Sequence, residues 1–181
     1  MPNLPALTPH DAPGKSRDIL SDIIGRHGSA GVMVRTMANS PALLQGYLDL
    51  SRAMKRAKIP RALSEKISLA VQERLGCALC LAAHTEAGRA AGLTDTDIAL
   101  ARQGTATDAR QAALVAFAVR VLTEPAFLTG DDVAALRGHG WSDRIIAEVV
   151  GLVSLNLLTG AFNLVAGLEP TTEHATSPAD R

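Results

Sequence analysis

Aromatic residues are scarce in this 181-residue sequence, at 3% of the composition, although hydrophobic residues together make up 47%. A buried core must therefore be built mainly from alanine, leucine, valine and isoleucine. Net charge is also absent, because 18 basic residues balance 18 acidic ones. Nucleic-acid binding requires clustered lysine and arginine to neutralise phosphates, so this balance argues against a nucleic-acid partner. The length suits one domain with a real core, and a charged share of only 20% excludes a disordered chain.

Signals for export or for a membrane are also missing. Residues 1–13 are rich in proline and hold no apolar run of the length that an export signal needs, so we expect a cytoplasmic protein with reduced thiols. Residues 149–168 contain no charged side chain and approach the length of a bilayer-spanning helix. Asn156 and Asn163 within that stretch would be costly in lipid. We therefore expect no membrane span, and interpret the stretch as a helix buried in the core or between subunits.

Helix caps punctuate the sequence, whereas no segment has the alternating pattern of a convincing β-strand. Ser40 followed by Pro41 is typical of a helix start, and Gly76 interrupts the apolar stripe that follows Pro60. Three Thr-x-x-Asp pairs and Ser142 mark further starts, because their side-chain oxygens can accept hydrogen bonds from free backbone amides. The sequence therefore predicts an all-α fold. Beyond the helices that begin at Pro41 and after Pro60, helices are expected over residues 77–91, 95–102, 106–123, 130–138 and 143–165.

The predicted organisation has three segments. Residues 1–38 form an N-terminal extension with a short helix, residues 39–168 form a helical domain, and residues 169–181 form a flexible tail. The small side chains of this alanine-rich chain let helices approach closely. The uncharged face of residues 149–168 is larger than one short helical core readily covers, so we expect a homo-oligomer.

Two cysteines and a histidine make the most informative motif, with Cys77, Cys80 and His84 spaced by three and then four residues. Such steps return to nearly the same face of a helix, so the three side chains share one stripe. Gly76 places the first cysteine at a new helix N-terminus, where free amides and the helix dipole favour a thiolate over a thiol. On this argument Cys77 should be the more acidic of the two thiols.

Four kinds of site come into question for this Cys-x-x-Cys-x-x-x-His pattern. Dithiol chemistry would let one thiolate attack an oxidant while the other thiol closes a disulfide. A zinc site would need a fourth ligand beside the two cysteines and the histidine, such as Glu65 or Glu73. Covalent haem attachment is excluded, because Leu81 instead of histidine follows Cys80. Two buried cysteines beside a hydrogen-bonded histidine would be a purely structural alternative.

A longer pattern surrounds these residues. Leu63-Ser64-Glu65 precedes the cysteines, and Ala91-Gly92-Leu93-Thr94 with Asp97-Ile98 follows them. Over about residues 41–122, this combination resembles the AhpD-like alkylhydroperoxidases of the carboxymuconolactone decarboxylase superfamily. The resemblance implies an all-helical fold, a homo-oligomer, and reduction of hydroperoxides without a metal or haem.

The resemblance also implies roles for individual residues. Cys80 matches the cysteine that attacks the peroxide, and Cys77 matches its partner, which closes the disulfide and meets an external dithiol reductant. Glu65 and His84 match the proton relay that ionises the attacking cysteine. This assignment disagrees with the helix-dipole argument. We follow the resemblance, because a base one turn beyond Cys80 can select that thiol over its neighbour.

Other polar residues could lie on the same face. Glu73 is a rival for Glu65, since an unbroken helix would place it in line with the cysteines. Gly76 breaks that register, which favours Glu65 as the relay carboxylate. Ser68 and Gln72 lie near the same face and are expected to hydrogen-bond within the site.

Ala78 and Leu79 depart from the family pattern, which often has histidine or tyrosine between the cysteines, so a proton donor is missing there. The expected function is a thiol peroxidase that takes a hydroperoxide substrate and an external dithiol. One alternative is a carboxymuconolactone decarboxylase-type lyase, an activity that generally does not depend on the cysteine pair. The other is a non-enzymatic oligomer that senses redox state or binds zinc.

Overall fold

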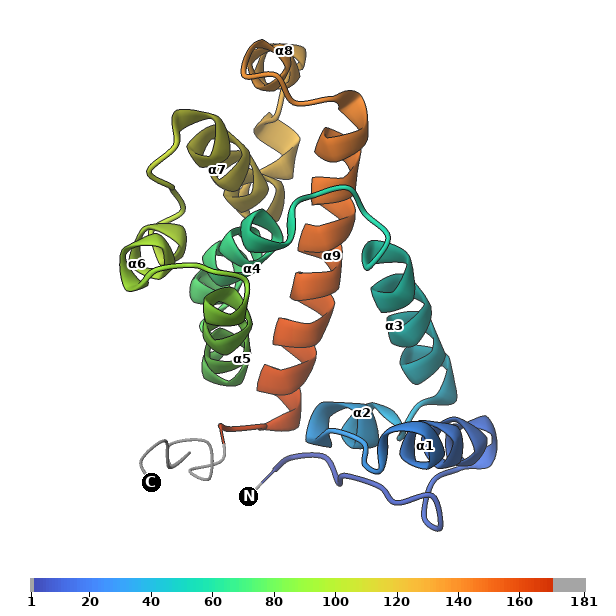
Figure 1. Cartoon of the computed structure of the whole chain (residues 1–181). Coiled ribbons are helices and arrows are strands. Elements are labelled where there is room, and N and C mark those ends of the chain that lie inside the picture. Colours follow the sequence, from blue (N-terminus) through green and yellow to red (C-terminus); the bar gives the residue numbers. More distant parts are fainter. Residues whose placement is uncertain (1, 171–181) are drawn as a thin grey trace, which may run out of the picture.

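Helices are the regular secondary structure of residues 2–170, the part of the chain that the computed structural model describes. The long helix α9 (Asp143–Ala166) stands at the centre, with α3 (Pro41–Met54) on one side and α4 (Arg61–Leu75) and α5 (Ala78–Ala90) on the other (Figure 1). The remaining elements are α1 (Gly14–His27), α2 (Val32–Met37), α6 (Asp95–Arg102), α7 (Ala109–Thr123), the 3₁₀ helix η1 (Pro125–Phe127) and α8 (Gly130–Gly138). The predicted all-α class is confirmed.

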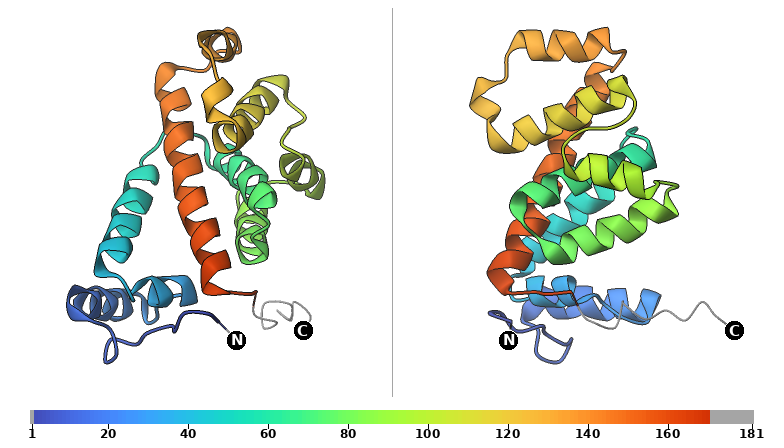
Figure 2. Two further views of the ribbon diagram at one scale, coloured as in Figure 1. Left: turned by 180° about the vertical axis from the view of Figure 1, so that it is seen from behind. Right: turned by 90° about the vertical axis from the view of Figure 1, so that its left-hand side faces the viewer.

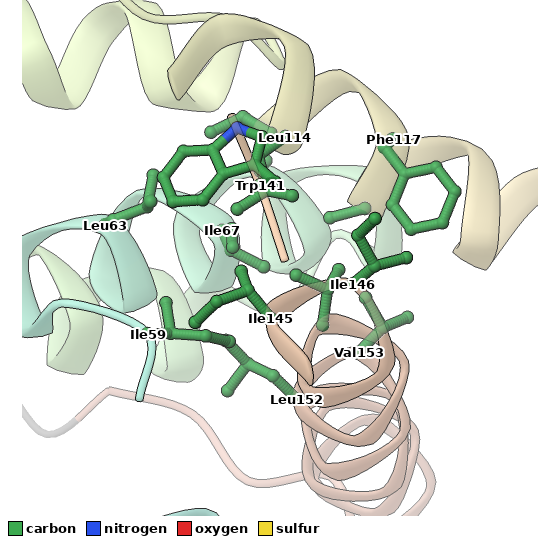
Figure 3. Packing of buried hydrophobic residues seen from close by; sticks show 14 of the residues in the cluster. Ile59, Leu63, Ile67, Leu114, Phe117, Trp141, Ile145, Ile146, Leu152 and Val153 are labelled. Atoms are coloured by element: carbon green, nitrogen blue, oxygen red, sulfur yellow. The ribbon is translucent and has the colours of Figure 1, made fainter. Parts of the chain in front are cut away.

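Helix α4 is the most buried of the helices, because α5, α6, α7 and α9 all pack against it. The main core gathers where α4, α7 and the first half of α9 meet (Figure 3). Trp141 lies over this core, where its indole Nε1 donates to the carbonyl of Arg110 at 2.8 Å. A single tryptophan therefore supplies the largest side chain of a cluster that is aliphatic apart from Trp141 and Phe117, as the scarcity of aromatic residues requires.

The N-terminal extension forms a second cluster at the opposite end of α9 from α7 and α8 (Figure 2). It holds two helices, α1 and α2, where the sequence predicts one short helix. Asn3 fastens it to α9, because its backbone N–H donates to the carbonyl of Ala166 at 2.8 Å and its side chain to that of Val165 at 2.9 Å. These bonds occupy carbonyls that the end of a helix leaves free. Of the predicted tail, residues 171–181 lie outside the described residues.

Most predicted helix boundaries agree with the structure to within a residue or two, and one start is wrong. The helix predicted over 106–123 begins at Ala109, so Thr105 is not its cap. The carboxylate of Asp108 accepts the backbone N–H of Gln111 at 2.8 Å, which makes Asp108 the N-cap. Thr105 and Asp108 both suit a cap, and the turn after Gly104 delays the helix until the second of them.

Helix α9 has two unlike faces. Of the described helices it alone is long and apolar enough to cross a membrane, with a mean hydropathy of 1.9 over its most apolar window, a test that a core helix of a soluble protein also passes. One face packs against α3, α4 and α7, as predicted for a core helix. The other leaves large apolar side chains exposed: Val150, Leu157, Leu164 and Val165.

Candidate active site

The two cysteines lie at the junction of α4 and α5. Gly76 ends α4 with a left-handed backbone (φ 73°), which turns the chain so that α5 starts two residues later. Cys77 is the N-cap of α5, and its Sγ accepts the backbone N–H of Cys80 at 3.3 Å. A disulfide joins Cys77 to Cys80, whose Cα atoms are 5.3 Å apart. The sequence predicted a helix over residues 77–91 that contains both cysteines, whereas in the structure Cys77 is the N-cap of that helix.

A carboxylate from α4 and an imidazole from α5 pair beside the cysteines. Glu65 Oε2 lies 2.7 Å from His84 Nδ1, and Glu65 Oε1 lies 2.8 Å from Arg61 Nε. Gly88, one turn beyond the histidine, packs tightly, because a Cβ there would lie 3.1 Å from Leu93 Cδ1, while Glu65 Cβ at 3.8 Å would be an ordinary contact. The absence of a side chain therefore lets α5 pack closely against Leu93, beside the Glu65–His84 pair.

Burial makes the pairing of this carboxylate important. Glu65 is only 5% exposed, and a lone carboxylate would be strongly disfavoured at such a depth. Here each carboxylate oxygen has a nitrogen partner, and the more exposed Arg61 supplies a permanent positive charge. The imidazole of His84 is about one-third exposed and reaches solvent. The pair can therefore hold a proton between solvent and the interior.

A set of buried amides joins α9 to this site. Asn163 Nδ2 donates to Cys80 Sγ at 3.3 Å. Two turns earlier, Asn156 Nδ2 donates to Ser68 Oγ at 3.1 Å, and Gln72 Nε2 donates to Asn156 Oδ1 at 3.0 Å. Ser68 and Gln72 thus hydrogen-bond beside the site, to Asn156. Sequence reasoning did not propose Asn163 as a site residue, although an amide in a charge-free apolar helix was the available signal.

A cavity of about 610 Å³ opens onto these groups. Its polar wall includes Glu65, Cys80, His84 and Asn163, whereas much of the rest is apolar. The apolar lining comes from five parts of the chain, namely α2, α3, the loop before α4, α5 and α9, and includes Met33, Val34, Met54, Ile59, Leu79, Leu152 and Leu155. Tyr47 also lines it, and burial raises the pKa of this phenol, with a smaller opposing effect of Ser51.

The two sulfurs differ in access. Cys80 lines the cavity and is 6% exposed, while Cys77 is 1% exposed and does not line it. A small molecule in the cavity can therefore reach Cys80 directly. The expected meeting of Cys77 with an external reductant stays a prediction.

Neither the rival carboxylate nor the zinc ligand set converges on the site. Glu73 Oε2 lies 2.7 Å from Arg102 Nε, on the side of α4 that faces α6, so Glu65 is the carboxylate that meets His84. The two cysteines bond to each other and His84 turns to Glu65. Among residues 2–170, no group of three or more His, Cys, Asp or Glu side chains is arranged to hold a metal ion.

Solved structures share this architecture at low sequence identity. A peroxidase-related protein from Ralstonia eutropha JMP134, described as an alkylhydroperoxidase AhpD core, superposes with a TM-score of 0.80 at 20% identity, over 95% of this chain and 93% of that one. A peroxidase-related protein from Silicibacter sp. TM1040 has a TM-score of 0.77 at 20% identity, over 94% of this chain and 91% of that one. The debrominase Bmp8, as a cysteine-to-alanine variant in complex with 2,3,4-tribromopyrrole, has a TM-score of 0.70 at 16% identity, over 95% of both chains.

Sequence comparison points the same way. Among curated protein sequences, none matches the chain. Residues 41–124 match the model of the carboxymuconolactone decarboxylase family, and this segment contains Glu65, both cysteines and His84. Over residues 41–124 the chain is therefore similar to the carboxymuconolactone decarboxylase family, and its fold is AhpD-like.

Proposed function

We propose that the protein is a thiol peroxidase that reduces hydroperoxides with Cys77 and Cys80. The observation that carries this proposal is the disulfide that joins Cys77 to Cys80, because Cys80 lines a cavity whose wall also holds the Glu65–His84 pair. A disulfide between cysteines three residues apart constrains the chain little, so a redox role explains it better than a structural one.

The first step ionises Cys80 and breaks the peroxide. His84, held by Glu65, takes the proton of the Cys80 thiol, directly or through a water. The thiolate attacks the outer oxygen of the hydroperoxide, so that an S–O bond forms and the O–O bond breaks. The leaving alkoxide takes the proton back and departs as an alcohol. Cys80 is now a sulfenic acid, oxidised by two electrons.

The second step closes and reopens the disulfide. The Cys77 thiol attacks the sulfenic sulfur of Cys80, forms the S–S bond and releases water. An external dithiol then reduces this bond by exchange and becomes a disulfide itself, which returns both thiols to the protein. A cytoplasmic location, which we also propose, supplies the reducing conditions that this last exchange needs.

Thiol counting tests this function. We expect the dithiol form to lose two thiols per chain after one equivalent of cumene hydroperoxide and to regain them with a dithiol. Cys80→Ser should lose peroxide turnover by at least about 1,000-fold, since the attacking atom is gone. Full turnover in that variant would reject the mechanism. Decarboxylation of a cyclic lactone by a variant without cysteines would instead favour the lyase alternative.

A second candidate is reductive dehalogenation of a small aromatic ring. A debrominase shares the fold, and the mostly apolar cavity of about 610 Å³ has room for such a ring. The electron balance is the same, because two thiols become a disulfide while a carbon–bromine bond is replaced by carbon–hydrogen and bromide leaves. Bromide release from a brominated pyrrole, without turnover of hydroperoxides, would favour this activity.

We further propose that the chain forms a homo-oligomer through α9. Val150, Leu157 and Leu164 are exposed at steps of seven residues, a spacing that keeps them on one stripe between paired helices. Leu157→Glu should lower the mass measured by light scattering, because a carboxylate in a paired apolar stripe is costly. Phe127→Glu, at an exposed apolar side chain of η1, is the matched control. A wild-type monomer at micromolar concentration would contradict the proposal.

A further inference from the structure

Asn163 is a buried group of the site that the mechanism above does not use. It comes from the end of α9, is 4% exposed, and donates its side-chain N–H to Cys80 Sγ at 3.3 Å. Its other polar atom, Oδ1, is buried and has no hydrogen-bond partner within residues 2–170. An unpaired buried carbonyl costs stability, so a chain that keeps one is expected to gain something other than packing from the residue.

The amide is held in place from two directions. The backbone carbonyl of Asn163 accepts the N–H of Leu168 at 2.9 Å, where Gly167 closes α9. Asn156, two turns earlier on the same face, bonds to Ser68 of α4 and so limits rotation of α9 about its axis. The donor therefore points at the sulfur because the helix end is fixed, and little of the bond energy is spent on ordering the side chain.

We propose that Asn163 is a catalytic residue that stabilises the sulfur of Cys80 as the attacking thiolate and thereby makes Cys80, instead of Cys77, the cysteine that meets the peroxide. The inference rests on the proposed peroxidase function. A thiolate accepts a hydrogen bond more strongly than a neutral thiol or a disulfide sulfur does, so the amide favours the ionised form. Because Cys80 is only 6% exposed, water can contribute little to stabilising its thiolate.

The same geometry resolves the conflict over which thiol is more acidic. Cys77 Sγ accepts the backbone N–H of Cys80 at the start of α5, which is the donor that the helix-dipole argument relies on. Cys80 Sγ has the side-chain donor of Asn163. Without that amide only the Cys77 sulfur would keep a hydrogen-bond donor. Asn163 therefore supplies the donor for the Cys80 sulfur that the start of α5 does not supply.

Single-cysteine variants test the assignment with a built-in control. Cys77→Ser leaves Cys80 alone, Cys80→Ser leaves Cys77 alone, and each is combined with Asn163→Leu. The pKa of the remaining thiol is read from the ultraviolet absorbance of its thiolate against pH. We expect Asn163→Leu to raise the pKa of Cys80 by about one to two units and to leave that of Cys77 unchanged. Iodoacetamide should react more slowly with Cys80 in proportion to the lost thiolate.

A second variant guards against loss of folding. Asn163→Asp keeps the size of the side chain but puts a carboxylate beside the sulfur, and should raise the pKa of Cys80 at least as far as leucine does. Thermal unfolding of Asn163→Leu should occur at an unchanged or higher midpoint, because the unpaired Oδ1 leaves with the amide.

Two results would overturn the proposal, and they differ from failure of the peroxidase. An unchanged pKa of Cys80 in both variants, or an equal rise at both cysteines, would remove Asn163 from the chemistry. A wild-type protein that turns over no hydroperoxide would reject the proposed function while the titration still reports whether Asn163 sets the acidity of Cys80.

Discussion

The first half of α9 packs apolar side chains into the main core, whereas its second half bonds through Asn156 to Ser68 and Gln72 of α4 and through Asn163 to Cys80. In the main core, Val149 and Leu152 are buried in the apolar cluster, and the one indole N–H has its acceptor. In the site, Asn163, which bonds to Cys80, and Gln72, which bonds to Asn156, each leave a buried oxygen unpaired within residues 2–170.

The main core and the site thus differ in whether their buried polar groups all have hydrogen-bond partners. The main core follows the rule that buried polar groups are few and satisfied. The site tolerates unpaired oxygens because its amides place donors at particular atoms, and the stability lost there is offset by packing elsewhere. Substitutions in the core should therefore change stability, and substitutions in the site should change chemistry.

Trp141→Ala should produce the largest effect on stability. Removing the indole leaves a cavity in the main core and frees the carbonyl of Arg110, so the free energy of unfolding should fall by about 3–5 kcal/mol. Chemical denaturation monitored by circular dichroism measures this loss. The fraction that stays folded should still form the Cys77–Cys80 disulfide. Loss of less than about 1 kcal/mol would show that the core does not depend on this side chain.

Glu65→Gln should show the opposite pattern. It keeps the size of the side chain but removes the charge that pairs with His84 and Arg61, so kcat/KM for cumene hydroperoxide should fall by roughly 100-fold. The free energy of unfolding should change much less than in Trp141→Ala.

Glu73→Gln is the matched control, with the same change on the same helix at a side chain that pairs with Arg102. Its kcat/KM should stay within about twofold of wild type. The reverse result, with loss in Glu73→Gln and none in Glu65→Gln, would transfer the relay to the rival carboxylate.

Gly160→Ala tests how closely α9 and α4 approach beside the site. A Cβ at this position would lie 2.5 Å from Gln72 Oε1 and 2.7 Å from Leu75 Cδ1, so the free energy of unfolding should fall by about 1–3 kcal/mol. Gly46→Ala in α3 is the control, since a Cβ there meets nothing within 4 Å. That change should stabilise the protein by about 0.5–1 kcal/mol, because alanine loses less backbone entropy in a helix. Equal effects at both positions would contradict the close approach.

The sequence predicted the helices well because caps act locally. Ser40, Thr94 and Ser142 each accept an N–H from the residue three positions on, as their neighbours in sequence suggest. The predicted start of α7 was wrong because Thr105 and Asp108 are both suitable N-cap residues, and the local sequence pattern does not decide between them.

The site was predictable only in part, because a sequence pattern reports contacts between residues that are near in sequence and not those between distant helices. The pairing of Glu65 with His84 came from a motif within 19 residues. Asn163 lies 83 residues from Cys80, and its contact depends on the rotation of α9 against α4, which no local pattern encodes. The helix-dipole argument considered only the donor at the start of α5, whereas the donor to Cys80 Sγ comes from that distant helix.

Lys66 is a buried polar group of a third kind, because it is charged and has two hydrogen-bond partners. Its Nζ lies 2.8 Å from Asp97 Oδ1 and 3.1 Å from Gln111 Oε1, and the hydrogen bond from Lys66, with a smaller contribution of Thr94, lowers the pKa of Asp97 to about 2. Because the carboxyl has a lower pKa in the folded protein than its ordinary value of 3.8, the pair stabilises the fold above about pH 4 and loses this contribution as the pH falls toward about 2.

Lys66→Gln should therefore have the smallest effect and a defined pH dependence. At neutral pH the free energy of unfolding should fall by about 1 kcal/mol, a modest loss because the side chain of Asp97 is partly exposed. The difference between wild type and Lys66→Gln should shrink as the pH falls from about 4 to about 2, where Asp97 becomes protonated in both proteins. Urea denaturation at a series of pH values measures this convergence. A difference that stays constant with pH would mean that Lys66 stabilises the protein by packing its aliphatic stem. The contrast between a paired buried charge and buried amides with an unpaired oxygen would then rest on Asn163 and Gln72 alone.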